Sequence, residues 1–581
     1  MSEKKFEIET IRHSLSHVMA AAVMEIFPDT KLGIGPAIDN GFYYDFDTSA
    51  DKCGNDAEKC RISEDDFQKI EKKMRELINS DLKLERSEIS ADEAKKMFAD
   101  QPYKLELVSD FGDEKISTYK LGEFEDLCRG PHVDSTADLK SAGWKLDKIA
   151  GAYWKGSEKN PMLTRIYALA FENPEELKKY EVIIQEAEKR DHRKIGQDID
   201  LFSFHPEGPG FVFWHDRGWF IFQKLIEYWR EIHRREKYQE VNTPVLLSAE
   251  LWKTSKHWDN YRDKMFVAKT ASDDDFTLGV KPMNCMGGIL IYKNKIHSYR
   301  ELPIKMGEIG LVHRNEGSGE LHGLMRLRQF TQDDAHIFCR ENQIKEEILK
   351  VLQLCFEVYK KFDLEIDHIE LSTRPEKSTG SDEAWETAEK TMKEILAENK
   401  IEHKINEGDG AFYGPKFDFH LRDAIGRTWQ CGTIQLDFAQ PENFDLSYID
   451  EKGEKVRPVM IHRVIYGAIE RFLGIYLENT AGILPVWLVP TQAIILPISN
   501  KHFDYSGEIM AKLETAGIRA EIDDRNESIG KKIREAEMQK IPYMLIIGDK
   551  EIIANKVALR KLGAGDKGQV KISEIINEIL K

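Results

Sequence analysis

Residues 307–338 read GEIGLVHRNEGSGELHGLMRLRQFTQDDAHIF, and this stretch decides the fold of the middle of the chain. Its pattern predicts two short strands joined by a glycine-rich loop. The loop and its flanks carry Arg314, Glu316, Arg326 and Arg328. Arginines on rigid strands suit bidentate recognition of phosphate, so the stretch predicts a nucleotide site. An exposed basic hairpin would explain any one of these four residues, but it explains all four together poorly.

The composition around this stretch is that of a large globular chain. Its 581 residues predict three to four domains, and a hydrophobic content of 41% excludes global disorder. No apolar run approaches the length of a membrane span, and the start of the chain lacks the pattern of a secretory signal. Seven sparse, irregularly spaced cysteines indicate a reducing cytosol, so we expect a cytoplasmic protein without a membrane partner.

The charge is unevenly distributed. A net charge of -18, taken alone, favours a small-molecule enzyme over a nucleic-acid-binding protein, because phosphate neutralisation needs Lys and Arg. From residue 486 onward, however, 15 Lys and Arg residues stand against 14 Asp and Glu residues. Positive residues also gather at 189–194 and in the glycine-rich loop. The net charge therefore does not exclude a nucleic-acid partner.

The N-terminal part of the chain pairs two motifs of the same spacing. A helix is predicted over 9–27, with one apolar stripe and with His13 and His17 on the opposite face, so that neither is expected in a core. Cys128 and His132 flank a predicted Gly-Pro turn. The four side chains form either a tetrahedral zinc set or a metal-free hydrolytic pocket, and surface histidines beside an ordinary turn are the plain alternative.

Two further regions give the domain organisation. A highly charged helix over 173–196, closed by Gly196, is predicted to connect an N-terminal domain to a larger central one. From about residue 486, short β-type runs alternate with helical ones, which indicates a compact α/β domain. The predicted strands are 493–497 and 543–547, and the predicted helices are 506–515, 528–540 and 572–580.

At this point the motifs resemble those of a known family. His313-Arg314-Asn315-Glu316 and the downstream Arg-x-Arg-x-Phe-Thr-Gln-Asp-Asp-Ala-His resemble motif 2 of class II aminoacyl-tRNA synthetases, and within that class the chain looks like the threonyl-tRNA synthetase family. The resemblance covers essentially the whole chain in the right order. Other matching segments are Thr243-Pro244 (motif 1), 281–285, 371–376, 411–416, 430–435, and His462-Arg463 with Glu470-Arg471 (motif 3).

The resemblance implies an α+β multidomain fold. Its parts would be an N-terminal α/β editing domain over 1–178, a connector helix over 179–196, a class II catalytic domain with an antiparallel sheet over 197–485, and an α/β anticodon-binding domain over 486–581. The small N-terminal domain common in bacterial members is expected to be missing.

The resemblance also implies roles for individual residues. The catalytic residues would be Arg314, Glu316, Arg471 and His257. The threonine and ATP pocket would be lined by Met283, Arg326, Gln332, Asp334, Tyr413, Lys416, Gln430 and Gln435. One zinc per subunit would be held by Cys285, His336 and His462. The editing residues would be His13, His17, Cys128 and His132, with Asp126 as an orienting carboxylate. The anticodon would be read by Asn526, Arg534, Glu551 and Arg560.

The implied activity is that of a homodimeric threonine–tRNA ligase that uses ATP with Mg²⁺, threonine and tRNA(Thr), and that hydrolyses mischarged seryl-tRNA(Thr). An apolar pocket separates isosteres such as threonine and valine by only about 10²-fold, so a three-ligand zinc that accepts amine and hydroxyl is a physical solution. Serine lacks only a methyl, so a second, hydrolytic site is needed; the resemblance therefore favours the hydrolytic pocket over a metal at the N-terminal cluster. The alternatives are a catalytically reduced paralogue that acts as an RNA-binding regulator, and an editing hydrolase.

Three features depart from the family pattern. Met286 and Gly288 replace the usual proline and histidine after the cysteine ligand. Gly317 and Gln329 replace a proline and a glycine in motif 2, which predicts a more mobile loop. Cys53 and Cys60 lie in a polar loop that looks like an insertion, and their spacing favours two exposed thiols.

Overall fold

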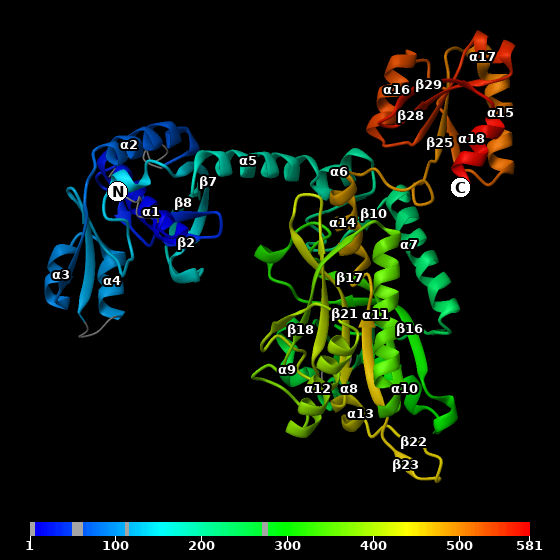
Figure 1. Cartoon of the computed structure of the whole chain (residues 1–581), viewed down its shortest axis with the longest axis horizontal. Helices are drawn as coiled ribbons and strands as arrows, with labels where there is room; N and C mark the ends of the chain where they lie inside the picture. The colour runs from blue at the N-terminus through cyan, green and yellow to red at the C-terminus, as the bar shows by residue number, and fades with distance from the viewer. Residues whose placement is uncertain (1–5, 49–61, 111–114, 270–276) are drawn as a thin grey trace. The chain divides into compact units, whose positions relative to one another are not determined.

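The structure is a computed structural model that describes residues 6–48, 62–110, 115–269 and 277–581 (Figure 1). The chain divides into two compact units, Met1–Gln185 and Glu186–Lys581. Within the described ranges, no helix has the length and apolarity needed to cross a membrane. The cysteines in these ranges are all free thiols. Cys53 and Cys60 lie outside the described residues.

The first unit contains two antiparallel sheets. The larger has the order β1-β3-β8-β7, with β2 also paired to β3, and the smaller has the order β4-β5-β6. The strands are β1 (Lys31–Leu32), β2 (Ala37–Ile38), β3 (Gly41–Asp47), β4 (Leu84–Ile89), β5 (Ile116–Leu121), β6 (Phe124–Leu127), β7 (Gly143–Tyr153) and β8 (Met162–Phe171). The helices are α1 (Ile8–Ile26), α2 (Phe67–Asn79), α3 (Ala91–Met97) and α4 (Pro102–Asp110).

Helix α1 confirms the predicted helix and corrects the expectation for His17, although not for the partly exposed His13. Its apolar stripe packs on α2 and β3, as the 3.6-residue period requires. The opposite face is covered as well, because the ring of Phe124 and the loop that ends at His132 lie against it. His17 is therefore only 3% exposed and is buried. Periodicity located the histidine face correctly but could not show that a second layer covers it.

The predicted connector is two helices rather than one. Helix α5 (Pro174–Lys189) ends at the basic run, and α6 (His192–Asp198) starts anew with Asp191 as its cap, since the Asp191 side chain accepts from the Arg193 N–H at 2.8 Å. Gly196 does not close the helix but lies buried inside α6. A Cβ there would stand 2.5 Å from the Phe202 ring, which accounts for the glycine.

An eight-stranded sheet organises the second unit, in the order β11-β16-β17-β24-β21-β20-β18-β19. All pairs are antiparallel except β11 with β16 and β18 with β19 at the two edges. The strands are β11 (Gln239–Glu240), β16 (Ile304–His313), β17 (Gln329–Cys339), β18 (Glu365–Ser372), β19 (Lys404–Asn406), β20 (Lys416–Arg422), β21 (Thr428–Asp437) and β24 (Val459–Val464). The opening stretch thus forms β16 and β17, paired over their full length around the predicted loop.

Helices and several small sheets surround this large sheet. Helices of the unit are α7 (Asp216–Arg235), α8 (Ala249–Thr254), α9 (His257–Asn260), α10 (Cys285–Lys293), α11 (Ile344–Lys361), α12 (Asp382–Glu398), α13 (Ala439–Asn443) and α14 (Ile469–Thr480). Small sheets are formed by β9 (Phe202–Ser203) with β10 (Phe213–Trp214), by β12 (Leu246–Ser248), β13 (Val267–Lys269) and β14 (Thr277–Val280), and by β15 (His297–Ser298), β22 (Tyr448–Ile449) and β23 (Lys455–Val456).

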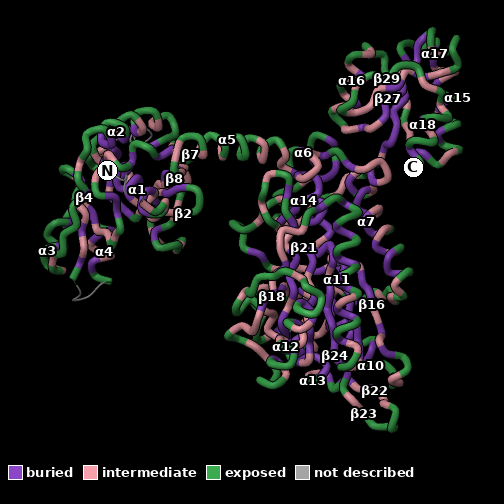
Figure 2. The backbone as a smooth tube through the Cα atoms, in the orientation of Figure 1, coloured by how far each residue is buried: buried purple, intermediate pink, exposed green. Residues whose placement is uncertain are grey.

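The two faces of the large sheet differ in chemistry. Because side chains alternate along a strand, β17 sends Asp333, Ile337 and Cys339 to one face, and Gln332, Asp334 and His336 to the other. The first face packs on α11 in the main apolar core, which shows as buried backbone in Figure 2. The second face is polar from Gln332 to His336, where it holds the candidate site, and apolar at Phe338. The alternation of side chains along β17 thus places core residues on one face and candidate-site residues on the other.

The last segment forms the predicted α/β domain. Its sheet has the order β26-β25-β27-β28-β29, and the two predicted strands, β25 (Ala493–Pro497) and β27 (Tyr543–Ile547), are its adjacent parallel centre. The other strands are β26 (Ala520–Ile522), β28 (Val557–Lys561) and β29 (Gly565–Val570). The helices α15 (Phe503–Thr515), α16 (Ile529–Met538) and α18 (Ile572–Ile579) confirm the three predicted helices, and α17 (Asp549–Ala554) adds a fourth. Apolar clusters fill both faces of the sheet.

Candidate active site

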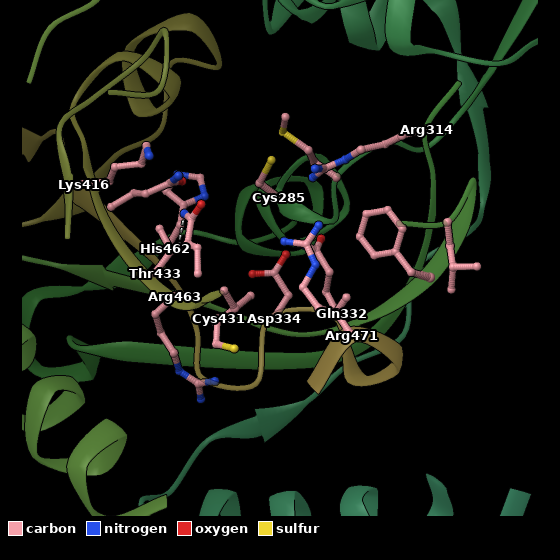
Figure 3. A pocket seen from close by; sticks show the side chains of 18 of the residues that line it. Cys285, Arg314, Gln332, Asp334, Lys416, Cys431, Thr433, His462, Arg463 and Arg471 are labelled. Carbon is pink, nitrogen blue, oxygen red and sulfur yellow. Dashed lines mark hydrogen bonds between the residues drawn. The ribbon is translucent and has the colours of Figure 1, made fainter. Parts of the chain in front are cut away.

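A cavity of about 320 Å³ lies on the polar face of the large sheet. Its size is that of a small-molecule site. Residues of β17, β20, β21, β24, α10 and α14 line it, and Figure 3 shows Cys285, Arg314, Asp334, Lys416, His462 and Arg471 around it, with Arg463 pointing away. All the predicted zinc and pocket residues line it, as do Arg314, Glu316 and Arg471: Met283, Cys285, Arg314, Glu316, Arg326, Gln332, Asp334, His336, Tyr413, Lys416, Gln430, Gln435, His462 and Arg471.

The predicted zinc ligands form one buried cluster. The ligand atoms of Cys285, His336 and His462 all lie within 4.8 Å of one another, although the residues are far apart in sequence. Strand register explains this, because His336 of β17 pairs directly with His462 of β24. Cys285 begins α10, which packs against β17. The three predicted ligands thus meet because two strands that are distant in sequence pair with each other, and not because the residues follow a local spacing.

The polar contacts of this cluster fit a metal ion. Among the buried side-chain atoms of the described residues, His336 Nε2 is one that has no hydrogen-bond partner. Asp334 Oδ1 is 3.6 Å from this nitrogen, beyond hydrogen-bonding range. An unsatisfied buried nitrogen costs about 1–3 kcal/mol, which a bound cation would offset. One cysteine and two histidines, with a fourth position open to the cavity, are the donor set of a catalytic zinc.

Neighbouring groups orient these ligands. His462 Nε2 donates to Asp437 Oδ2 at 2.8 Å, which leaves Nδ1 as the free nitrogen. Asn284 donates to Asp334 Oδ2 at 3.1 Å. Burial, followed by Asp334 and Asp437, raises the pKa of the Cys285 thiol well above its usual value. The thiol is therefore protonated without a cation and must lose its proton when it ligates one.

One wall of the cavity is arginine-rich. Arg314 donates from Nε to the Pro282 carbonyl at 3.3 Å and lies 5.0 Å above the Phe330 ring. Arg471 donates from Nε to the Met325 carbonyl at 2.8 Å, and burial lowers the pKa of its guanidinium. Glu316, at 9% exposure, is paired with Lys264 at 3.0 Å. Two guanidinium groups are thus aimed into a partly dehydrated cavity, where they attract phosphate strongly.

The opposite wall is a carboxylate-centred network on β20 and β21. Asp418 accepts from Lys416, from Gln430 Nε2 at 2.6 Å and from Thr433 Oγ1 at 2.8 Å. Tyr413 donates to Gln435 Oε1 at 2.7 Å. These bonds fix the rotamers of the side chains that face the cavity, so the site is preorganised.

His257 is the one predicted catalytic residue that does not line the cavity. It is fully buried, with Nδ1 2.8 Å from Ser255 Oγ and Nε2 3.2 Å from Met283 Sδ. Burial, followed by the nearby His462, lowers its pKa to about 3. The imidazole is therefore neutral, and Met283 separates it from the cavity.

The N-terminal cluster also comes together as predicted. The ligand atoms of His13, His17, Cys128 and His132 lie within 4.8 Å of one another. Cys128 Sγ is 3.2 Å from His13 Nε2 and 3.1 Å from His132 Nε2, and it accepts from the Gly130 N–H at 3.3 Å. Burial raises the pKa of Cys128 to about 11 and lowers those of all three histidines. Three neutral imidazoles around a neutral thiol can accept protons from a hydrolytic water.

The residues that support this cluster were only partly predicted from the sequence. Ser14 Oγ lies 3.1 Å from His132 Nδ1 and accepts from the Val133 N–H at 3.0 Å. The expected orienting carboxylate, Asp126, accepts instead from Tyr44 and pairs with buried Lys104 at 2.5 Å. Its negative charge is thus held behind the cluster. Ser14 lacked any sequence signal beyond its place one residue after His13.

The predicted anticodon residues lie on the α/β domain. Asn526 and Arg534 are exposed, at the approach to α16 and on it. Arg560 donates to Glu537 at 2.9 Å, and Glu551 accepts from Gln569 at 2.8 Å. Lys532 of α16 is only 3% exposed, and its ammonium donates to the carbonyls of Pro497 and Asp523.

The departures from the family pattern can now be located. Met286 is fully buried in an apolar cluster with Trp252 and Phe338. A Cβ at Gly288 would stand 3.5 Å from His336 Nδ1, so this glycine leaves space beside a predicted zinc ligand. A Cβ at Gly287 would collide with Thr243 at 2.4 Å. The first turn of α10 after Cys285 is therefore defined by packing rather than by a proline.

Several supporting residues were missed from the sequence. Asp437 orients His462, Asp418 organises the wall on β20 and β21, and buried Glu308 pairs with Lys281 at 2.8 Å. Glu470 accepts from the Thr331 N–H at 2.8 Å, and burial raises its pKa to about 7. Carboxylates are common in the chain, so only the strand register distinguishes these from exposed ones.

Comparison with known families agrees with this geometry. Residues 266–480 match the "tRNA synthetase class II core domain (G, H, P, S and T)". Residues 492–581 match an "Anticodon binding domain". Residues 116–167, which include Cys128 and His132, match the "Threonyl and Alanyl tRNA synthetase second additional domain".

Individual relatives match over nearly the whole chain. The "Threonine--tRNA ligase" of Carboxydothermus hydrogenoformans is 55% identical over 98% of this chain and 88% of its own length. That of Acetivibrio thermocellus is 53% identical over 99% of this chain and 88% of its own length. Among solved structures, the "RNA binding domain of Threonyl-tRNA synthetase" from Cryptosporidium parvum Iowa II aligns with a TM-score of 0.64 at 41% identity, covering 67% of this chain and 98% of its own.

Proposed function

The chain belongs to the threonine–tRNA ligase family, and from that membership we propose which of its own residues carry out each step. It is an enzyme that activates threonine with ATP and joins it to tRNA(Thr). The observation that carries the assignment is the single cavity that gathers a zinc-type donor set, two inward arginines and a polar wall. We assign editing to residues 1–178, connection to 179–196, catalysis to 197–485 and anticodon binding to 486–581.

Cys285, His336 and His462 hold one zinc ion per subunit in this proposal. The unpartnered His336 nitrogen and the Asp437 contact on His462 support it. When bound, zinc supplies a Lewis-acid position for the amine and hydroxyl of threonine that valine cannot complete. Asp334, Gln332 and Tyr413 line the same cavity and would limit the size of the side chain bound there.

Arg314 and Arg471 neutralise the phosphates of ATP, which binds with Mg²⁺, and Glu316 accepts from the adenine. Attack of the threonine carboxylate on the α-phosphate needs alignment and charge neutralisation more than proton transfer. Arg326, Lys416, Gln430 and Gln435 complete the substrate contacts. His257 supports acyl transfer to the terminal ribose from behind Met283, as a neutral group.

The N-terminal cluster removes serine that the catalytic site fails to reject. Serine and threonine differ by one methyl, which is worth only about 1–3 kcal/mol in binding. His13, His17, Cys128 and His132 form the hydrolytic pocket, and Asp126 stabilises it electrostatically through Lys104 and Tyr44. The hydrogen bonds within the cluster support a metal-free site.

Asn526, Arg534, Glu551 and Arg560 contact the anticodon bases of tRNA(Thr). We further propose that the enzyme is a homodimer in the cytoplasm. Leu290, Ile291 and Ile296 leave apolar surface exposed on and just after α10, a helix whose first turn contacts Thr243 of motif 1, which supports a second copy there.

Amino-acid-dependent pyrophosphate exchange tests the activation step. The zinc-replete protein should catalyse exchange with threonine, weakly with serine and not with valine. An absence of threonine-dependent exchange would refute the proposal. The RNA-binding regulator and the editing hydrolase are not favoured, because neither explains the intact arginine wall and donor set.

A further inference from the structure

A third histidine cluster lies on the large sheet outside the catalytic cavity. It consists of His368 and Glu370 on β18 and His420 on β20, and its ligand atoms all lie within 4.8 Å of one another. All three side chains are partly exposed, so the cluster is open to solvent. It lines no part of the cavity described above.

The geometry of the cluster matches a metal coordination sphere. His368 Nε2 is 3.0 Å from Glu370 Oε1, and His420 Nε2 is 3.4 Å from Glu370 Oε2. The two imidazoles are stacked in parallel, with centroids 4.4 Å apart and planes within 7°. Zinc-to-nitrogen and zinc-to-oxygen distances of about 2.0–2.2 Å separate tetrahedral ligands by about 3.3–3.6 Å. The donor distances therefore suit one ion, and rotation of one imidazole out of the stack would direct both ring nitrogens at it.

The outer contacts of the cluster orient its donors inward. Asp367 Oδ2 is 2.5 Å from His368 Nδ1, and an ionised carboxylate there requires the proton on Nδ1. His368 Nε2 then faces a second carboxylate, Glu370. Either a second proton or a cation must lie between them, since two bare lone pairs repel. A carboxylate behind a histidine is the arrangement that fixes the tautomer of metal ligands.

The remaining contacts stabilise the same arrangement. Asn406 donates to Glu370 Oε2 at 2.9 Å and holds the carboxylate in place from β19. Arg422 pairs with Asp367 and compensates its charge. Strand pairing sets the cluster, because His368 lies opposite His420 in the β18–β20 register.

We propose that His368, Glu370 and His420 form a second, solvent-accessible site for a divalent transition-metal ion such as Zn²⁺. Two imidazoles and one carboxylate suit zinc and similar ions better than Mg²⁺ or Ca²⁺. The site is independent of the proposed zinc at Cys285. It adjoins the active-site wall, because His420 pairs with Gln430 on β21 and Ser372 donates to Asp418 at 3.0 Å.

Zinc stoichiometry of the full chain tests this site. The protein and its variants are dialysed to equilibrium against micromolar free Zn²⁺, and bound zinc is measured by mass spectrometry. We expect His420→Gln and Glu370→Gln each to bind one zinc fewer per chain than the unchanged protein. His403→Gln is the matched control, because His403 is exposed beside β19 and outside the cluster. It should bind the same amount as the unchanged protein.

A gentler variant separates metal loss from misfolding. Asp367→Asn keeps all three ligands and removes only the orienting carboxylate, so we expect about 10- to 100-fold weaker zinc binding at this site and an unchanged number of sites. Equal zinc content and affinity in the unchanged protein, His420→Gln and Asp367→Asn would overturn the proposal. That result would show that a proton, and not a metal ion, lies between His368 and Glu370.

Discussion

The two histidine–cysteine clusters proposed for editing and catalysis differ in how their polar atoms are satisfied. In the N-terminal cluster, the Cys128 thiol contacts two of the three imidazoles, and Ser14 contacts His132. In the catalytic cluster, His336 Nε2 has no partner among the described residues. The first arrangement satisfies its thiol by contacts with its own histidines, whereas the second leaves a buried nitrogen that the proposed metal ion would satisfy. Clusters of the same residue types can therefore support different chemistry, and the hydrogen bonds around each cluster indicate which chemistry it supports.

Among the tests of this contrast, removal of the Cys285 thiol has the largest expected effect. Cys285→Ser should strip the proposed zinc and lower threonine-dependent pyrophosphate exchange by about 10³-fold, since a metal supplies several kcal/mol. Bound zinc and exchange rate are measured together. Cys339→Ala, which alters a buried cysteine in the apolar core, is the control and should retain zinc. A Cys285→Ser protein with full zinc and full exchange would contradict the ligand role.

The matching test in the N-terminal cluster is His17→Gln. Loss of a positioned base should slow hydrolysis of seryl-tRNA(Thr) by about 10²-fold or more, with threonine activation unchanged. Deacylation of pre-charged tRNA measures the first quantity, and pyrophosphate exchange measures the second. Unchanged clearance of serine would remove His17 from the mechanism.

A smaller effect is expected behind the catalytic cluster. Asp437→Asn keeps the shape of the side chain but weakens its bond to His462, so zinc affinity should fall by about 10- to 100-fold. Competition with a chromogenic chelator measures this affinity. If Asp437→Asn binds zinc as tightly as the unchanged protein, Asp437 does not support the metal.

The smallest effect concerns acid stability. Burial lowers the folded-state pKa values of His17 and His132, so below about pH 6.5 the unfolded chain takes up protons that the folded chain does not. Stability of the first unit should therefore be complete above this pH and fall by up to about 1.4 kcal/mol per histidine for each pH unit below it. Urea unfolding between pH 5 and 7, with His17→Gln for comparison, measures the slope. A slope unchanged by that substitution would place His17 in a solvated environment.

Sequence patterns predicted local elements well. The strands 493–497 and 543–547 match residue for residue, because short apolar runs with turn residues on either side have few other folded forms. The catalytic ligands could not be found from spacing, since 51 and 126 residues separate them. Only the family resemblance named them, and only the pairing of β17 with β24 explains why they meet.

Tertiary surroundings account for the remaining differences. Helical periodicity oriented His17 correctly but missed the layer that buries it, because a single helix pattern contains no information about a second partner. The break at Asp191 follows from a side-chain cap that competes with continuation of the helix. Asp437, Asp418 and Ser14 were missed because their roles depend on neighbours from other strands and helices.

The alternation along β17 also has an evolutionary consequence. Gain or loss of one codon within this strand would exchange its faces, placing Asp334 and His336 in the apolar core and Ile337 in the cavity. Both folding and catalysis would then fail together. Insertions should therefore accumulate in the loops and surface ribbons of related chains, while the length of β17 stays constant.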